Sequence, residues 1–325
     1  MLKPSKSSGA GGRAALRPVA VLIPCYNEET AIGRVVADFR AALPTADIYV
    51  YDNNSADRTA EVAGSAGALV RRETLKGKGN VVRRMFADVD AEVYVLVDGD
   101  ATYDAVSAPG MVARLVADRL DMVVGARVGR EELAYPRGHR VGNWLLTRAV
   151  ADMFGRAFSD VLSGYRVFSR RYVKSFPALS RGFEIEIELT VHALELGLPV
   201  AETSTPYFAR PVGSASKLNT WRDGLRIAWT ILRLYKSERP LRFFGSIGAI
   251  LAVTAVMLAL PLVVTFMREG LVPRLPTAIL STGLMLLAFL SLTCGLILST
   301  VTRGRREMKR LAYLAQPAPG GCDRE

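Results

Sequence analysis

The stretch VYVLVDGD, residues 93–100, joins an apolar run of strand type to an acidic turn. Val93–Val97 is rich in β-branched residues and has the length of a buried strand. Similar apolar runs lie at Val19–Ile23, Ile48–Tyr51, Ala68–Val70 and Met122–Val124. Apolar residues recur at helical spacing in Thr30–Leu43, Asp57–Ala66, Asn80–Val89 and Ser107–Asp118. Because strands alternate with helices, the sequence predicts an α/β domain with a mostly parallel sheet that is covered on both faces.

The residues directly after these runs are the candidates for chemistry, because parallel α/β sheets bind ligands at the carboxyl ends of their strands. Asp98 and Asp100 lie one residue apart on such a turn and could reach one divalent cation and the diphosphate that it bridges. Mg²⁺ and Mn²⁺ favour oxygen ligands of this kind. An Asp-Gly-Asp turn alone is common, so its companions matter. The first run leads into Pro24-Cys25-Tyr26-Asn27-Glu28, and the second leads into DNNSADRT, residues 52–59.

Together these segments resemble the family 2 glycosyltransferases of the GT-A (Rossmann-like) fold, whose members begin with a Pro-x-Tyr-Asn-Glu strand end and an Asp-Asp-x-Ser-x-Asp-x-Thr turn. The resemblance continues in order through Gly77-Lys78-Gly79-Asn80, Asp98-Gly99-Asp100, Gly125-Ala126-Arg127, Ser163-Gly164-Tyr165-Arg166, Arg210 and Gly213–Leu218. With two C-terminal apolar spans, the chain is similar to the membrane-anchored polyprenyl-phosphate glycosyltransferases, the dolichol-phosphate mannosyltransferase group and its bacterial relatives.

The resemblance implies a role for each matching position. The nucleoside would be held by Pro24, Tyr26, Glu28, Asp52 and Asn53, and the metal and diphosphate by Asp98 and Asp100. The acceptor phosphate would contact Arg127 and Arg140, and the donor diphosphate would be covered by Arg210 and Lys217. Gly77-Lys78-Gly79 has the composition of a phosphate loop without the Walker spacing, and Lys78 is a further candidate contact of the donor.

Two positions depart from the family pattern. Relatives often have a third metal ligand two residues after the second Asp, where this chain has Thr102, a weaker ligand. Most members have two Asp before the Ser-bearing turn, where this chain has Asp52-Asn53. An Asn side chain offers one acceptor and one donor group, which complements N3–H and O4 of uracil. This substitution favours a UDP-sugar over a GDP-sugar.

Glu184, Glu186 and Glu188 alternate after Phe183. On a helix, Glu184 and Glu188 would share a face and could be solvated surface. Opposite a donor site, Glu186 or a neighbour could instead orient the sugar or act as a base. Both interpretations stay open at this stage.

Two apolar stretches, Phe243–Met267 and Thr277–Val301, contain no charged residue and no His. Each has 25 residues, enough to cross a hydrocarbon core of about 30 Å, so both are predicted to be transmembrane helices. A buried helix pair of a soluble protein is the less favoured alternative. Basic residues cluster in 1–18, in 217–242 and in Arg303–Arg310, and the last two clusters would face anionic headgroups beside the spans.

The same charge bias predicts the topology, because the positive side stays in the cytoplasm. We therefore expect a multi-pass protein of the cell (inner) membrane with the catalytic domain and both termini in the cytoplasm. The expected organisation is a flexible basic arm (1–18), the glycosyltransferase domain (19–215), a juxtamembrane segment (216–242), two spans (243–267 and 277–301) and a basic tail (302–325).

The juxtamembrane segment has an amphipathic pattern. One apolar stripe contains Trp221, Leu225, Ala228, Leu232 and Tyr235, at helical spacing. Basic residues lie off this stripe. A helix of this type can lie in the membrane interface, and its position before a span favours that interpretation over a helix packed on the domain.

Composition excludes several other classes of protein. The chain has 325 residues, 50% hydrophobic and only 22% charged, which excludes a disordered chain. Its net charge is +11, but a nucleic-acid binder would spread its bases over the folded domain, so no nucleic-acid partner is expected. Three distant cysteines indicate no disulfide framework, and two histidines are too few for a His-rich metal site. The N-terminus is not a signal peptide.

The leading functional hypothesis is the inverting transfer of a sugar from a nucleotide-sugar to a membrane polyprenyl phosphate, which would be undecaprenyl phosphate in a bacterium. Mg²⁺ or Mn²⁺ would be the cofactor, and a homo-oligomer is compatible with this interpretation. Transfer to a lipid hydroxyl, with a carboxylate base from the Glu184–Glu188 group, is the second hypothesis. A non-catalytic, sugar-nucleotide-binding membrane scaffold is the third.

Overall fold

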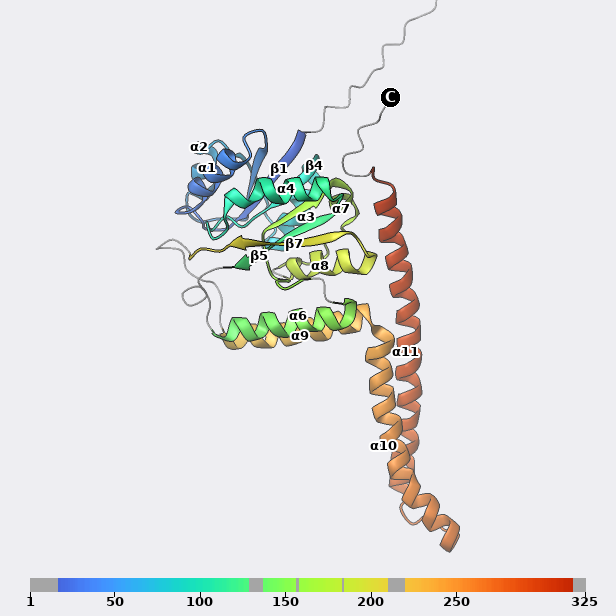
Figure 1. The fold of residues 1–325 in the computed structure, drawn as a ribbon. Coiled ribbons are helices and arrows are strands. Elements are labelled where there is room, and N and C mark those ends of the chain that lie inside the picture. Colours follow the sequence, from blue (N-terminus) through green and yellow to red (C-terminus); the bar gives the residue numbers. More distant parts are fainter. Residues whose placement is uncertain (1–16, 129–136, 156–157, 183, 210–219, 318–325) are drawn as a thin grey trace, which may run out of the picture.

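The computed structural model describes residues 17–128, 137–155, 158–182, 184–209 and 220–317. Figure 1 shows an α/β domain and a pair of long helices that run away from it side by side. These helices are α10 (Pro240–Glu269) and α11 (Leu275–Leu314). The described candidate site residues lie on the α/β domain and not on the helix pair.

The domain contains a seven-stranded sheet in the order β3-β2-β1-β4-β6-β5-β7. Its strands are β1 (Arg17–Cys25), β2 (Asp47–Asp52), β3 (Leu69–Arg72), β4 (Ala91–Leu96), β5 (Met122–Val128), β6 (Arg166–Ser169) and β7 (Val200–Pro206). The five apolar runs form β1 to β5, and the pairing is parallel except that β6 is antiparallel to β4 and β5. The prediction of a mostly parallel sheet is confirmed. The sequence did not predict β6 and β7, because β6 has only four residues and β7 is rich in polar residues, so neither contains an apolar run of strand length.

Helices cover both faces of the sheet, as predicted. One face packs against α1 (Ile32–Ala42), α2 (Thr59–Ser65) and α4 (Ala108–Ala117), through buried residues that include Phe39 and Leu115. The other face packs against α3 (Lys78–Asp88), α7 (Arg170–Ser175) and α8 (Ile185–Leu196), with Met85 and Leu189 in the core. Helix α8 is apolar on nearly all sides because it lies inside the domain.

Two further helices, α6 (Arg137–Phe154) and α9 (Thr220–Glu238), lie side by side below the sheet and transverse to α10 and α11 (Figure 1). Ile231 and Leu234 of α9 pack toward a small core under α8, whereas Ala228 and Leu232 of the predicted stripe are exposed. Trp229 is also 66% exposed. The described part of α9 therefore packs on the domain with one face and leaves two residues of the predicted stripe, Ala228 and Leu232, exposed, whereas Tyr235 of the same stripe is half-buried.

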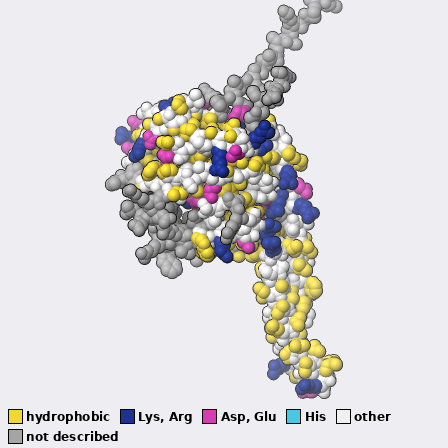
Figure 2. Space-filling view, viewed as in Figure 1, with side chains coloured by type: hydrophobic (Ala, Val, Ile, Leu, Met, Phe, Trp, Pro, Cys, Tyr) yellow, Lys and Arg dark blue, Asp and Glu magenta, His cyan; other side chains and the backbone are white. Residues whose placement is uncertain are grey.

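The helix pair α10–α11 is long and apolar enough to cross a membrane, and the most apolar windows are only 17% and 11% buried. Figure 2 shows apolar side chains along the whole length of the pair, with basic residues gathered where it meets the domain. Helix α11 runs on past Val301 to Leu314, so the bases that follow the second span lie on a helix.

Three members of this last basic cluster have partners within the protein that the sequence did not predict. Arg305, Arg306 and Lys309 form ion pairs with two buried carboxylates of the protein itself, Glu195 and Glu238. Charge counting along the sequence could not detect these pairs, because their acidic partners lie far away in the chain.

Candidate active site

The turns after β1 and β2 are bound to each other. The backbone N–H of Asn27 donates to Ser55 Oγ (2.9 Å), and the Asn27 side chain accepts from the N–H of Ala56 (2.8 Å). The N–H of Glu28 donates to Thr59 Oγ1 (2.9 Å), and the Thr59 hydroxyl donates to Asp57 (2.5 Å). The Pro24–Glu28 and Asp52–Thr59 motifs are therefore joined by hydrogen bonds, which fix the shape of this edge of the sheet.

Four carboxylates gather around the end of β1. Burial raises the pKa of the Cys25 thiol well above its ordinary value, and the negative charges of Glu28, Asp52, Asp98 and Asp100 raise it further. The structure thus brings these four predicted site residues together. Tyr26 lies on the same turn and is 40% exposed, and Pro24 is paired in register with Tyr51 of β2.

Asp100 is buried, and the hydroxyl of Thr102 donates to its Oδ1 (2.6 Å). Thr102 therefore orients Asp100, and it occupies the position where the family resemblance implies a third metal ligand. In the part of the chain that the structure describes, no three His, Cys, Asp or Glu residues are grouped as a metal site. Two carboxylates at a strand end still fit Mg²⁺ or Mn²⁺, because these ions commonly take their remaining ligands from water and substrate phosphates.

Gly164 makes room for Asp98. A Cβ built at Gly164 would lie closer than 3.0 Å to Asp98 Oδ2, a separation that real Cβ atoms do not show. The N–H of Gly164 donates to the hydroxyl of Tyr103 (2.9 Å), which holds the loop in place. Because β6 runs antiparallel, its start lies at the carboxyl end of β4, and the Ser163–Arg166 motif enters the site there.

Lys78 links two acidic residues of the site. Its Nζ contacts Asp98 Oδ1 and lies 2.5 Å from Glu186 Oε1, and both Lys78 and Glu186 are almost fully buried. Burial alone would lower the pKa of Lys78, but the two carboxylates raise it above its ordinary value, so Lys78 stays charged. Burial raises the pKa of Glu186, and Lys78 opposes this effect. Glu186 Oε2 is buried and has no hydrogen-bond partner among the residues that the structure describes.

Asn53 has a different set of contacts from those predicted. Its Nδ2 donates to the carbonyl oxygens of Glu73 (3.0 Å) and Leu75 (2.8 Å), and its Oδ1 accepts from the N–H of Gly77 (2.7 Å). Both amide hydrogens are therefore used by the loop before α3. This corrects the argument that the Asn53 amide would donate to uracil O4, because its donors are already engaged.

Arg127 lies near the C-terminal end of β5. Its guanidinium forms a two-point contact with Asp160, with Nε–Oδ2 at 2.6 Å and Nη2–Oδ1 at 2.7 Å. Its guanidinium also lies over the ring of Tyr207, 5.5 Å from the centroid. Burial would raise the pKa of Asp160, but the contacts with Arg127 lower it. Sequence reasoning missed Asp160, although this acid lies just before the Ser163–Arg166 motif.

Arg166 is a second residue whose role the sequence did not reveal. It is fully buried and donates to the carbonyl oxygens of Ser163 (2.9 Å) and Val161 (2.7 Å) and to Thr190 Oγ1 (2.9 Å). It therefore ties the motif loop to α8. Arg210 and Lys217 lie outside the described residues, and so does the side chain of Arg140, whose backbone belongs to α6.

The chain is similar in sequence to glycosyltransferases. A family described as Glycosyl transferase family 2 matches residues 20–176. Glycosyltransferase AglJ of Haloferax volcanii is 36% identical over 302 residues, which cover 91% of this chain and 98% of AglJ. A dolichyl-phosphate hexose transferase of the same organism is 30% identical over 222 residues, which cover 68% of this chain and 95% of that protein.

Solved structures show the same fold. Glucosyl-3-phosphoglycerate synthase from Mycobacterium tuberculosis, in complex with Mn²⁺, UDP-glucose and phosphoglyceric acid, has a TM-score of 0.55 and 22% sequence identity. The match covers 67% of this chain and 79% of that chain. The predicted fold class is confirmed by this likeness.

Proposed function

Because this chain belongs to glycosyl transferase family 2, we propose that it is a metal-dependent hexosyltransferase that moves a sugar from a nucleotide-sugar to a membrane polyprenyl phosphate. The main support is that the carboxylate-rich edge and the membrane-length helix pair belong to one molecule. The name of the dolichyl-phosphate hexose transferase, which this chain resembles over most of its length, points to the same class of acceptor. Undecaprenyl phosphate is the expected acceptor in a bacterial host.

The donor site is proposed at the ends of β1, β2 and β4. Asp98 and Asp100 would hold Mg²⁺ or Mn²⁺, which when bound would neutralise charge on the diphosphate leaving group. Lys78 and Thr102 orient these two carboxylates. From the family resemblance, Arg210 and Lys217 would cover the diphosphate. The UDP-glucose complex of the protein with the same fold supports a preference for UDP. Asn53 does not support it, because its amide donates to backbone carbonyl oxygens.

The acceptor needs no strong base, since a lipid phosphate is already anionic at pH 7. One of its oxygens would bond to the anomeric carbon while the bond from that carbon to the donor diphosphate breaks, which inverts the configuration and releases the nucleoside diphosphate. Positioning and charge stabilisation then supply most of the catalysis. Arg127 and Arg140 are the proposed contacts of the acceptor phosphate, with Asp160 fixing the plane of the Arg127 guanidinium.

We propose that α10 and α11 span the membrane with the domain and both termini in the cytoplasm. The exposed apolar residues Trp229 and Leu232 on α9 support a location of α6 and α9 at the membrane surface. The excess of Lys and Arg on the domain side of the helix pair supports this orientation.

A lipid hydroxyl is the second candidate acceptor. It is favoured by Glu186, because burial raises the pKa of this residue and its Oε2 lacks a partner, as would suit a general base. The ion pair with Lys78 opposes this role, because the positive charge of Lys78 lowers the proton affinity of Glu186 and engages its other oxygen, Oε1.

The deciding experiment supplies membranes that contain the protein with labelled UDP- and GDP-sugars and polyprenyl phosphate, and then extracts lipid products. A glycosyl phosphate is cleaved by mild acid, whereas a glycoside on a hydroxyl survives. An acid-labile product supports the polyprenyl-phosphate reaction. An acid-stable product supports the hydroxyl acceptor, and binding of a nucleotide without any lipid product would favour a scaffold.

A further inference from the structure

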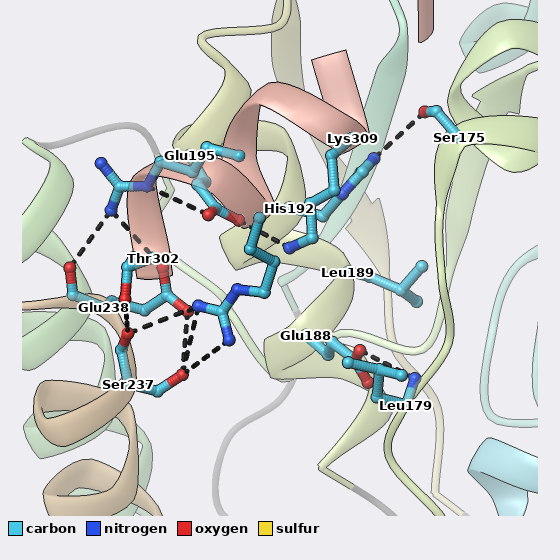
Figure 3. Close-up of polar contacts among 12 residues, drawn as sticks. Ser175, Leu179, Glu188, Leu189, His192, Glu195, Ser237, Glu238, Thr302 and Lys309 are labelled. Carbon is cyan, nitrogen blue, oxygen red and sulfur yellow. Dashed lines mark hydrogen bonds and ion pairs between the residues drawn. The ribbon is translucent and has the colours of Figure 1, made fainter. Parts of the chain in front are cut away.

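Three helices meet in a cluster of charges around two buried carboxylates, at the point where the helix pair joins the domain. This junction cluster consists of Glu195 on α8, Glu238 on α9, and Arg305, Arg306 and Lys309 on α11 (Figure 3). Arg306 Nε lies 3.0 Å from one oxygen of Glu195, and Lys309 Nζ lies 2.7 Å from the other. The Glu195 side chain is fully buried. The candidate active site uses none of these residues.

Glu195 depends on α11 for its charge partners. It lies in the last turn of α8, where the negative end of the helix dipole disfavours an acid, and burial adds a desolvation cost. Among the described residues, Glu195 forms ion pairs with Arg306 and Lys309. Arg310 also donates to the carbonyl oxygen of Leu196 (3.1 Å), an end-of-helix acceptor. The C-terminal part of α11 therefore supplies the charge partners and a hydrogen-bond donor that the C-terminal end of α8 needs.

The same part of α11 holds the bend between α9 and α10. Only Arg239 separates these two helices, with φ −131° and ψ 52° outside the helical region. A one-residue link could change its angle freely if nothing else held it. Thr302 donates to the carbonyl oxygen of Ser237 (3.2 Å), and Arg305 lies 2.8 Å from a carboxylate oxygen of Glu238. The transverse helix and the helix pair are thus held together at the bend.

A second contact lies further along α11. The hydroxyl of Tyr313 donates to Asp121 (2.8 Å), and Arg171 of α7 pairs with the same carboxylate (2.6 Å) while lying over the Tyr313 ring. Helix α11 is therefore attached to the domain at two separated points. Two attachment points on one rigid helix restrict rotation of the domain as well as translation.

From these contacts we propose that the junction cluster holds the catalytic domain at one height and tilt above the helix pair, with Glu195 as a positioning residue. The inference rests on the proposed function, in which the acceptor phosphate stays at the membrane surface. Such an acceptor cannot adjust to a tilted domain, so an error in height becomes an error in the distance between phosphate and donor sugar. Errors of about 1 Å can lower rates by about 10²-fold.

The test uses charge reversal and its repair in the full-length protein. Glu195→Lys and Lys309→Glu each break the Glu195–Lys309 pair, and the double variant restores opposite charges at these two positions, while Arg306 keeps Glu238 as its partner. Glu307→Lys is the matched control, because Glu307 is an exposed charge on the same segment of α11. Spin labels on the exposed native Cys294 of α11 and on Val116→Cys of α4 report the domain-to-helix distance, in a Cys322→Ser background.

We expect a narrow distance distribution for the unaltered protein, the control and the double variant, and a broad one for each single reversal. In nanodiscs, each single reversal should lower transfer to a long polyprenyl phosphate by about tenfold or more, while transfer to a water-soluble short-chain phosphate and UDP binding change by less than about twofold.

Narrow distributions in the single reversals would overturn the proposal. So would equal losses on the long and short acceptors, which indicate a simple loss of folded protein. If the unaltered protein transfers sugar to neither phosphate, the proposed function fails, and the label distances still decide whether the cluster orients the domain.

Discussion

Asp98 follows β4 and Gly164 precedes β6, two strands that run in opposite directions, and the carboxylate of Asp98 occupies the space where a side chain at position 164 would begin. The glycine of the Ser163–Arg166 motif therefore serves the metal-binding carboxylate proposed here. A residue without a side chain thus decides where the proposed metal ligand Asp98 can lie.

Gly164→Ala should displace Asp98 and weaken Mn²⁺ binding by about tenfold or more, because residues that orient ligands commonly affect metal affinity to this extent. Mn²⁺ binding can be measured by electron paramagnetic resonance in the presence of UDP. Gly110→Ala is the matched control, since no atom lies within 4 Å of a Cβ at that position. Equal Mn²⁺ affinity in both variants would show that Asp98 does not hold the ion.

Asp100→Asn should lower transfer by at least about 10²-fold while the fold stays intact, because the change removes a charge from the cation site with little change in volume. Turnover with Mn²⁺ or Mg²⁺ and the circular dichroism spectrum are the measurements. Near-normal turnover of the purified variant would exclude a metal role for this residue.

Arg127→Lys should raise the KM for the acceptor by about tenfold and leave the KM for the donor unchanged, because an ammonium cannot reproduce a two-point contact. Asp160→Asn should raise the same KM by a smaller factor, since it keeps the guanidinium and removes only the ion pair that fixes its plane. An unchanged acceptor KM in Arg127→Lys would exclude contact between Arg127 and the acceptor phosphate.

Asn53→Asp should lower the free energy of unfolding by about 1–3 kcal/mol, because it removes the donor of two hydrogen bonds and places a carboxylate against carbonyl oxygens. It should weaken UDP and GDP binding alike, which titration calorimetry can measure. A selective gain in GDP binding would restore the role in base recognition that the sequence suggested.

His192 should make the protein less stable as the pH falls. Burial, together with the nearby charge of Lys309, lowers its pKa from the ordinary value of 6.5 to about 3. Between these values the unfolded chain binds a proton that the folded protein excludes, so the free energy of unfolding falls as the pH drops, by up to about 1.4 kcal/mol per pH unit. His192→Gln should reduce this slope in thermal unfolding, and identical slopes would contradict the assignment.

The sequence by itself determined the elements whose patterns are local. Apolar runs placed five strands, helical spacing placed the helices between them, and two uncharged stretches placed α10 and α11. It also determined that the acidic turn belongs at the edge of the sheet, because the carboxyl ends of parallel strands meet there. Periodicity and run length depend only on neighbouring residues, so these features could be predicted.

Only the tertiary structure decided which partners the polar residues take. The reversed strand β6 brings Gly164 to Asp98, the loop before α3 engages the amide of Asn53, and buried acids pair with the bases at the end of α11. In sequence, Glu195 and Lys309 look like two solvated charges far apart. Their pairing depends on how the chain returns to the domain after the helix pair, and a charge acquires a specific partner only where folding removes both groups from water.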